Sequence, residues 1–281
     1  MHKAVLVTGA SSGIGEATTL ELAHKGFRVF AAARSEAKLA AFKGLAGDRI
    51  TPLAMDVTDE ASIAAAFSTI AADCGGLFGI VNNAGVSVTG PAETAPLDEW
   101  RRQFETNVFG VMNVVRAAAP HMRAAGSGRI VIVGSITGRL APPFMGVYAA
   151  SKHALEGLAD SLRLELKPFG VSVSLVRPGF TNTPFAAQEQ AGLEPHTRDG
   201  EPYAAAAGAF KRWHGDQHSN GLAPTRIAEL IHRALTDSKP RARYTAPRNL
   251  QALSVFHHLA PYRLGDLMMD RATTPPEKEN S

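Results

Sequence analysis

The sequence predicts an α/β fold in a single domain, a doubly wound parallel sheet of seven strands with helices on both faces. Three observations predict it. Short apolar runs of strand length alternate along the chain with longer segments of helical periodicity. The first apolar run leads through a glycine-rich turn into a helix. Polar motifs follow several of the predicted strands, at the carboxyl ends where such sheets bind ligands.

The first predicted strand, 4–7, is apolar throughout and runs through Thr8 into a glycine-rich turn, with a helix predicted over 16–26. Glycines let the backbone approach a phosphate, and free N–H groups at a helix start point at it. The layout predicts a dinucleotide pyrophosphate site, although a plain strand-to-helix turn would look similar. The residues of this turn are Gly9, Ser11, Ser12, Gly13, Ile14 and Gly15.

The remaining elements repeat the alternation of strand and helix. Further strands are predicted over 28–33, 49–54, 77–81, 129–133 and 171–176, with 241–246 as the candidate seventh. Helices are predicted after Ser35, from Asp59, over 97–118, over 148–166, and over 225–235 with Thr225 as its cap.

Two later segments break this regular pattern. Residues 181–220 contain few apolar repeats and several Gly, Pro and His residues, which predicts a flap with one or two short helices. The apolar positions of 250–269 predict packing on the sheet edge, a cover over a substrate cleft, or contact with a membrane surface. We therefore expect a body over 1–246 that includes a substrate flap at about 181–223, followed by a C-terminal extension and tail over 247–281.

Composition and charge exclude several classes of function and structure. The net charge of the 281 residues is only +3 and the basic residues are scattered, so no nucleic-acid partner is predicted. The single cysteine, Cys74, excludes an internal disulfide framework and suits a reducing compartment. No segment resembles a secretory leader, and no apolar run approaches the ~18 residues of a transmembrane helix. A cytoplasmic location is expected.

A second motif, Tyr148-x-x-x-Lys152, opens the helix predicted over 148–166. Its two side chains share one helix face, about 6 Å apart at Cβ. An ammonium there favours the phenolate and is expected to lower the pKa of Tyr148 toward the working range of an acid–base group. Ser135 at the end of the preceding strand makes a chance pairing less probable, and Asn107 lies in the helix predicted over 97–118.

Together these motifs make the sequence resemble the short-chain dehydrogenase/reductase family, which has a Rossmann fold, the loop T-G-x-x-x-G-x-G and an Asn-Ser-Tyr-Lys tetrad. The resemblance is specific over residues 3 to about 185 and looser to about 246. It implies that Tyr148 is the general acid or base and that Ser135 hydrogen-bonds the reacting oxygen. It further implies that Lys152 holds the nicotinamide ribose and shifts the Tyr148 pKa, while Asn107 positions a relay water.

The resemblance also implies further cofactor contacts, to the adenine ring, the adenosine ribose and the nicotinamide carboxamide. Asn83 to Gly85 would in addition support the sheet. The residues concerned are Asp56, Val57, Asn83, Ala84, Gly85, Pro178, Gly179 and Thr183.

Arg34 bears on the choice between the two nicotinamide cofactors. An acidic residue at the end of the second strand would accept hydrogen bonds from a ribose 2′-hydroxyl, but this strand ends in Ala33–Arg34. A guanidinium pairs with phosphate, and Ser12 offers a hydroxyl nearby. The sequence predicts NADP, with NAD as the less favoured cofactor. Stacking of Arg34 on adenine or exposure to solvent stays open as the alternative.

The function expected is NADP-dependent hydride transfer to or from a carbonyl or secondary alcohol. A loose likeness of the C-terminal region to the steroid and retinoid dehydrogenases suggests an apolar small-molecule substrate. Alternatives are a carrier-bound acyl ketone reductase and a non-catalytic NADP-binding regulator. Relatives pair through the two long helices, so a homodimer or homotetramer is expected. His214 and His218 have i, i+4 spacing, but without a third ligand no metal site is predicted.

Overall fold

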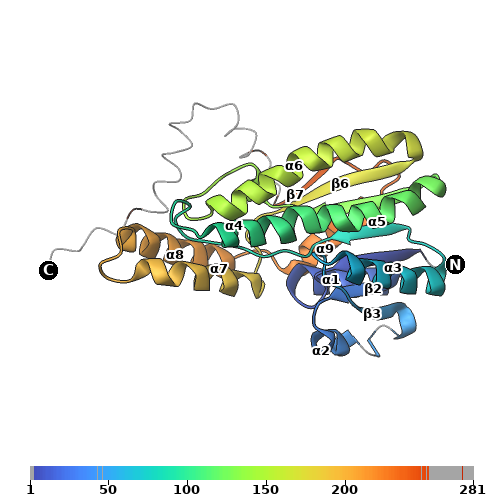
Figure 1. The fold of residues 1–281 in the computed structure, drawn as a ribbon, viewed down its shortest axis with the longest axis horizontal. Coiled ribbons are helices and arrows are strands. Elements are labelled where there is room, and N and C mark those ends of the chain that lie inside the picture. Colours follow the sequence, from blue (N-terminus) through green and yellow to red (C-terminus); the bar gives the residue numbers. More distant parts are fainter. Residues whose placement is uncertain are drawn as a thin grey trace.

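The computed structural model describes residues 3–42, 44–45, 47–247, 249–250, 252 and 274. In this part of the chain one seven-stranded sheet has the order β3-β2-β1-β4-β5-β6-β7 with every pair parallel (Figure 1), which confirms the predicted fold. The strands are β1 (Ala4–Thr8), β2 (Arg28–Ala33), β3 (Ile50–Ala54), β4 (Gly79–Asn82), β5 (Gly128–Val133), β6 (Val171–Pro178) and β7 (Arg243–Ala246).

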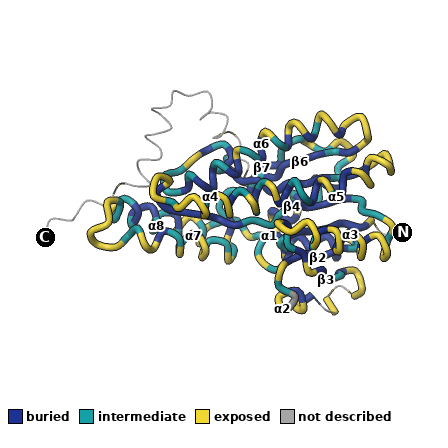
Figure 2. Tube along the Cα trace, in the orientation of Figure 1, coloured by how far each residue is buried: buried dark blue, intermediate teal, exposed yellow. Residues whose placement is uncertain are grey.

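Helices cover both faces of the sheet, because successive apolar side chains of each buried strand point to opposite sides. Leu6 and Ile130 contribute to one core, which they share with α3 (Glu60–Cys74), α5 (Gly110–Ala124) and α6 (Gly146–Leu166). Val5, Val7 and Val131 contribute to the other core. It is covered by α1 (Gly13–His24), α2 (Glu36–Leu39) and α9 (Pro224–Thr236). Burial follows this layering, with buried strands and exposed outer helix surfaces (Figure 2).

The helix predicted over 97–118 is interrupted. It consists of α4 (Leu97–Phe104), one π-helical turn over Glu105–Phe109, and α5, which continues six residues beyond the prediction to Ala124. Gly110 directly after the turn allows close packing, because a Cβ there would lie 2.7 Å from a methyl group of Val57. A wider turn of this kind leaves no periodicity signal, and such turns are frequent at functional sites.

The flap predicted over 181–223 contains two helices, as the prediction of one or two allowed, but the second helix is longer than expected. It forms α7 (Phe185–Leu193), a 3₁₀ turn and α8 (Ala204–Ser219), two helices that lie beside each other at one end of the molecule (Figure 1). Leu193 and Phe210 are fully buried and pack against Met145 and Tyr148 at the start of α6. The segment is therefore a packed cover and not an open loop.

The predicted start of the last helix was wrong. α9 begins at Pro224 with Ala223 at its N-cap position, so Thr225 lies inside the first turn and is not the cap. Proline is favoured at the first helical position because it needs no N–H partner there.

The expected roles of 250–269 concern residues that are almost all outside the described part of the chain. Leu250 is described, and its side chain lies against Gly179. Among the described residues, no helix is both long enough and apolar enough to cross a lipid bilayer.

Candidate active site

A cavity of about 1280 Å³ runs along the carboxyl ends of the strands and continues between α6, α7 and α8. It brings together nearly all of the residues that the sequence analysis selected; only Gly15 and Asn107 do not line it. Those that do are Gly9, Ser11, Ser12, Gly13, Ile14, Arg34, Asp56, Val57, Asn83, Ala84, Gly85, Ser135, Tyr148, Lys152, Pro178, Gly179 and Thr183.

The turn after β1 is packed so closely that side chains would collide with neighbouring backbone at two of its glycines. Gly9 has a φ of +63°, and a Cβ there would lie 2.8 Å from the Cα of Ala84. A Cβ on Gly15 would lie 2.1 Å from the carbonyl oxygen of Gly9. Ser12, the N-cap of α1, makes no side-chain cap hydrogen bond, so N–H groups of the first turn remain for an anion. The turn therefore fits a dinucleotide pyrophosphate.

Thr8 and Asn83 tie this turn to the end of β4. The Thr8 hydroxyl accepts hydrogen bonds from the backbone N–H groups of Asn83 and Ala84, both at 3.0 Å. The Asn83 amide donates to the carbonyls of Thr8 and Gly9 at 3.0 and 3.2 Å. These hydrogen bonds hold the glycine turn against the end of β4, which is the sheet-supporting role expected of Asn83. Thr8 was not selected from the sequence, although a polar residue ending an apolar strand was the available signal.

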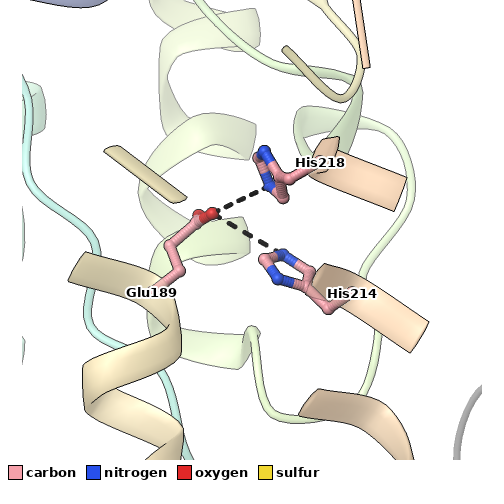
Figure 3. A group of neighbouring side chains, drawn as sticks. All are labelled: Glu189, His214 and His218. Atoms are coloured by element: carbon pink, nitrogen blue, oxygen red, sulfur yellow. Dashed lines mark ion pairs between the residues drawn. The ribbon is translucent and has the colours of Figure 1, made fainter. Parts of the chain in front are cut away.

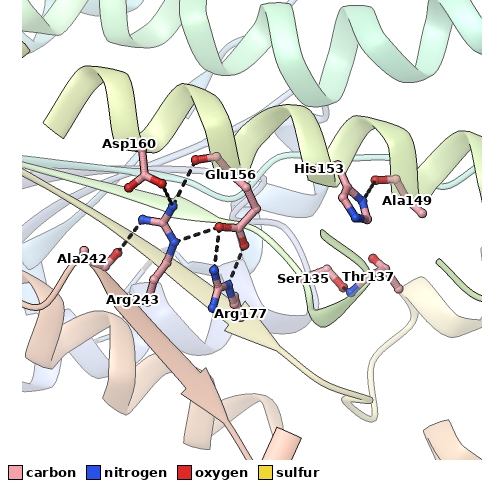
Figure 4. A network of polar contacts seen from close by, with 9 residues as sticks. All are labelled: Ser135, Thr137, Ala149, His153, Glu156, Asp160, Arg177, Ala242 and Arg243. Atoms are coloured by element: carbon pink, nitrogen blue, oxygen red, sulfur yellow. Dashed lines mark hydrogen bonds and ion pairs between the residues drawn. The ribbon is translucent and has the colours of Figure 1, made fainter. Parts of the chain in front are cut away.

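Ser135, Tyr148 and Lys152 meet where β5 ends and α6 begins. Tyr148 and Lys152 are buried, and the Lys152 ammonium lies 5.5 Å from the centre of the Tyr148 ring. The ammonium donates a hydrogen bond to the carbonyl of Val133 at 2.9 Å. The Ser135 hydroxyl accepts from the N–H of Thr137 at 3.1 Å, which fixes it at the cavity wall (Figure 4).

The acid–base properties of this group differ from the sequence-based expectation. Burial raises the pKa of the Tyr148 phenol, and the carboxylate of Glu189 raises it further, while the Ser135 hydroxyl lowers it. Burial lowers the pKa of Lys152 to about 8, against an opposing effect of Glu189. In the protein alone, desolvation therefore outweighs the lowering of the Tyr148 pKa that was predicted from Lys152.

Asn107 lies in the π turn and is buried. Its side-chain oxygen accepts from the N–H of Val86 at 2.8 Å, and its amide nitrogen donates to the Val86 carbonyl at 2.9 Å. Gln103, one helical turn earlier, donates to the same carbonyl at 2.9 Å and to Ser151 at 3.1 Å. Both side chains hold the segment after β4 against α6. Gln103 was missed because a lone glutamine in a helix carries no spacing signal.

Behind the site, Glu156 joins α6 to the last two strands (Figure 4). Its carboxylate accepts from Arg177 of β6 at 2.6 and 2.7 Å and from Arg243 of β7 at 2.8 Å. Arg243 also pairs with Asp160 at 2.9 Å. Glu156 lies one turn after Lys152, so this network fixes the helix that carries both Tyr148 and Lys152.

Glu189, His214 and His218 form a second polar cluster on the cavity wall (Figure 3). Glu189 comes from α7, and the two histidines come from successive turns of α8. Burial lowers the pKa of His214 to about 4. Burial also lowers that of His218, but the Glu189 carboxylate and the Thr181 carbonyl outweigh it and raise this pKa. Sequence reasoning found the histidine pair and missed Glu189, which belongs to a different helix.

At the opposite end of the cavity, Arg34 follows β2 and is exposed. It has no ion-pair partner among the described residues. Lys38 lines the same end of the cavity. Asp56 follows β3, and its carboxylate accepts from the backbone and the hydroxyl of Thr58 at 2.9 and 2.8 Å. This end of the cavity is therefore lined by the cations of Arg34 and Lys38 and by the Asp56 carboxylate, which is hydrogen-bonded to Thr58.

The family model for short chain dehydrogenase matches residues 3–194. A 17-beta-hydroxysteroid dehydrogenase type 6 of Bos taurus is 34% identical, with 98% of this chain and 90% of that protein covered. An NADPH-dependent 3-dehydrocapnine reductase of Ornithobacterium rhinotracheale is 32% identical, with 95% and 94% covered.

Among solved structures, a short chain dehydrogenase/reductase from Burkholderia phymatum in complex with NAD superposes with a TM-score of 0.81. It is 29% identical, with 98% of this chain and 97% of that chain covered. The fold, the residues that line the cavity and the extent of the sequence match all indicate the same family. The chain belongs to the short-chain dehydrogenase/reductase family of oxidoreductases, which act on CH–OH donors and bind NAD(P).

Proposed function

We propose that this chain transfers a hydride between NADP(H) and a carbonyl or secondary alcohol of an apolar small molecule. The supporting observation is one continuous cavity, with the glycine turn and Arg34 at one end and Ser135, Tyr148 and Lys152 further along it. A dinucleotide held by its pyrophosphate at Gly9 to Gly15 would lie along this cavity toward Tyr148. The cofactor would then exchange the hydride with the substrate carbon, and Tyr148 would exchange the proton with the oxygen bonded to that carbon.

In this proposal the bound cofactor supplies or accepts the hydride, and the protein orients the reactants and handles the proton. Tyr148 donates its proton to the carbonyl oxygen during reduction and takes it back during oxidation. Ser135 donates a hydrogen bond to the same oxygen. Lys152, as an ammonium on the next turn of α6, stabilises the phenolate that Tyr148 leaves behind. The amide nitrogen of Asn107 donates to Val86 and Ser151, and its oxygen accepts from Val86, which leaves one lone pair of that oxygen for a relay water.

NADP is the cofactor we favour. A 2′-phosphate next to Arg34 and Lys38 gains charge-assisted hydrogen bonds, whereas no carboxylate ends β2 to accept bonds from a 2′-hydroxyl. One relative is named as NADPH-dependent and one solved structure holds NAD, so this preference rests on Arg34.

An apolar substrate suits the remaining wall of the cavity, where the side chains are mostly large and apolar. A steroid-, retinoid- or hydrophobic ketone-like molecule fits this surface, and one relative is named for a hydroxysteroid. The residues are Ile136, Leu140, Pro142, Met145, Phe185 and Trp213.

The test is a panel of apolar ketones and alcohols, followed by the absorbance change of NADPH. At least one ketone is expected to oxidise NADPH with the wild-type chain. Tyr148→Phe is expected to lose more than about 99% of that rate while still binding NADPH, because a general acid contributes about 10²- to 10⁴-fold. Turnover by Tyr148→Phe near the wild-type rate would contradict the proposal.

A further inference from the structure

The cluster of Glu189, His214 and His218 has the geometry of an ion site. Oε2 of Glu189 lies 3.0 Å from Nε2 of His218 and 3.6 Å from Nε2 of His214. The three ligand atoms all lie within 4.8 Å of one another. Figure 3 shows the carboxylate facing both rings, which come from the same side of α8.

The carboxylate oxygen at the centre of this cluster faces only the two imidazole rings. The Glu189 side chain is 3% exposed, and its Oε1 accepts a hydrogen bond from the Ser87 hydroxyl at 3.2 Å. Its Oε2 is buried and, apart from the ion-pair contacts with the two histidines, has no partner within the described residues. A buried carboxylate oxygen needs a positive charge beside it, which a protonated His218 or a bound cation supplies.

Neighbouring groups orient the two rings. Nδ1 of His218 donates to the carbonyl of Thr181 at 3.0 Å, which leaves the lone pair of this ring on Nε2, facing Glu189. Nδ1 of His214 lies 3.3 Å from the side-chain amide of Gln190. When this amide group is rotated by 180°, its oxygen can accept a hydrogen bond from Nδ1 of His214. The rotation breaks the 3.2 Å hydrogen bond from the amide to the Lys211 carbonyl. Both Nε2 atoms can then act as ligands.

Two spacings in the cluster are closer to those around a metal ion than to those around an organic cation. Tetrahedral zinc with bonds of about 2.0–2.1 Å separates neighbouring ligand atoms by about 3.4 Å. An ammonium with hydrogen bonds of about 2.8 Å separates them by about 4.6 Å. The two distances from Glu189 to the histidines, 3.0 and 3.6 Å, are closer to the smaller value, and all three ligand atoms lie within 4.8 Å of one another.

We propose that Glu189, His214 and His218 bind a divalent transition-metal ion of the zinc class, with a further coordination position open to the cavity. Imidazole nitrogen with carboxylate oxygen suits such ions, and three protein ligands leave one tetrahedral position free. All three residues line the cavity that also contains Tyr148. The open position therefore faces the substrate region and takes a water or a polar group of the substrate.

The test uses the full chain with any affinity tag removed, stripped with a chelator and then titrated with Zn²⁺ or Co²⁺. About one ion per chain is expected by elemental analysis after gel filtration, with a Co²⁺ absorption spectrum typical of a four-coordinate site. Glu189→Gln and His218→Asn are expected to weaken binding at least about 10-fold, while His121→Asn on the exposed face of α5 leaves it unchanged.

Gln190→Glu keeps the proposal testable if the other variants fold poorly. Its carboxylate accepts from Nδ1 of His214 and is expected to tighten ion binding, a gain that misfolding does not produce. Less than about 0.1 ion per folded wild-type chain would overturn the proposal. So would binding that Glu189→Gln and His218→Asn leave unchanged. In either case the cluster is an ion pair, or a site for a substrate amine.

Discussion

The Lys152 ammonium and the Tyr148 phenol are buried on successive turns of α6, and burial acts on them in opposite directions. It raises the pKa of Tyr148 and lowers that of Lys152. The sequence predicted the pair and its shared helix face from the i, i+4 spacing. It could not predict the direction of the Tyr148 shift, because burial and the carboxylate of Glu189 come from tertiary packing.

The pH dependence of carbonyl reduction follows from Lys152. Its pKa is lowered to about 8, so the ammonium is lost as the pH rises through that value. Glu189 from α7 and Tyr148 on its own helix are the ionisable groups that face it. We expect kcat/KM for reduction to be constant below about pH 8 and to fall above it. The measurement is a pH profile of NADPH oxidation, and a rate that rises above pH 8 would contradict the assignment.

We propose that Arg34 determines the choice between NADP and NAD. Arg34→Ala removes the guanidinium that would pair with a 2′-phosphate, a charged interaction of about 1.5–3 kcal/mol. KM for NADPH is expected to rise about 10- to 100-fold while KM for NADH stays within about twofold. Arg101→Ala, an exposed residue outside the cavity, serves as the matched control. A wild-type preference for NADH would disprove the role of Arg34.

At the scale of elements, strands and strand-end motifs were the most predictable features. β2 matches the prediction in both bounds, since a buried parallel strand is a short continuous apolar run. The π turn over Glu105–Phe109 and the two helices of the flap were not predictable in this detail. Their packing depends on contacts such as Gly110 with Val57 and Phe185 with Tyr148, which periodicity does not encode.

Substitution of Glu156 tests whether its ion pairs with β6 and β7 stabilise α6. Glu156→Ala leaves Arg177 and Arg243 without their shared carboxylate in a largely buried position. Losing one partner of such a network costs about 3 kcal/mol or more, so a clear fall in Tm is expected. Glu99→Ala breaks an exposed pair with Arg102 and is expected to leave Tm nearly unchanged. Equal Tm values for both variants would refute the proposed bracing of α6.

At the scale of the whole molecule, the single sheet and its layers follow from the sequence, while the substrate and the assembly do not. The cavity is lined by segments from residue 9 to residue 250, whereas the family resemblance was specific only to about residue 185. The part of the wall that comes after residue 185 was therefore not predictable from the resemblance. The division into a body over 1–246 and an extension over 247–281 stays a prediction, because most of the extension lies outside the described residues.

The proposed pairing of two chains through α4, α5 and α6 rests on exposed apolar side chains. Leu97 is 67% exposed, Phe109 is 52% exposed and Leu164 is 59% exposed. We expect a homodimer or homotetramer, because such side chains gain from burial against a second copy. Phe109→Glu combined with Leu164→Glu is expected to yield monomers by light scattering. A wild-type chain that is monomeric at micromolar concentration contradicts this arrangement.

The most direct test of the central claim follows the hydride itself. NADPH deuterated at C4 is incubated with the chain and a ketone from the panel, and the alcohol product is analysed by mass spectrometry. When the label is on the transferred face of C4, we expect one deuterium on the carbinol carbon for each NADPH oxidised. We expect almost no product with Tyr148→Phe. Product without deuterium, or equal product from Tyr148→Phe, would contradict direct hydride transfer assisted by Tyr148.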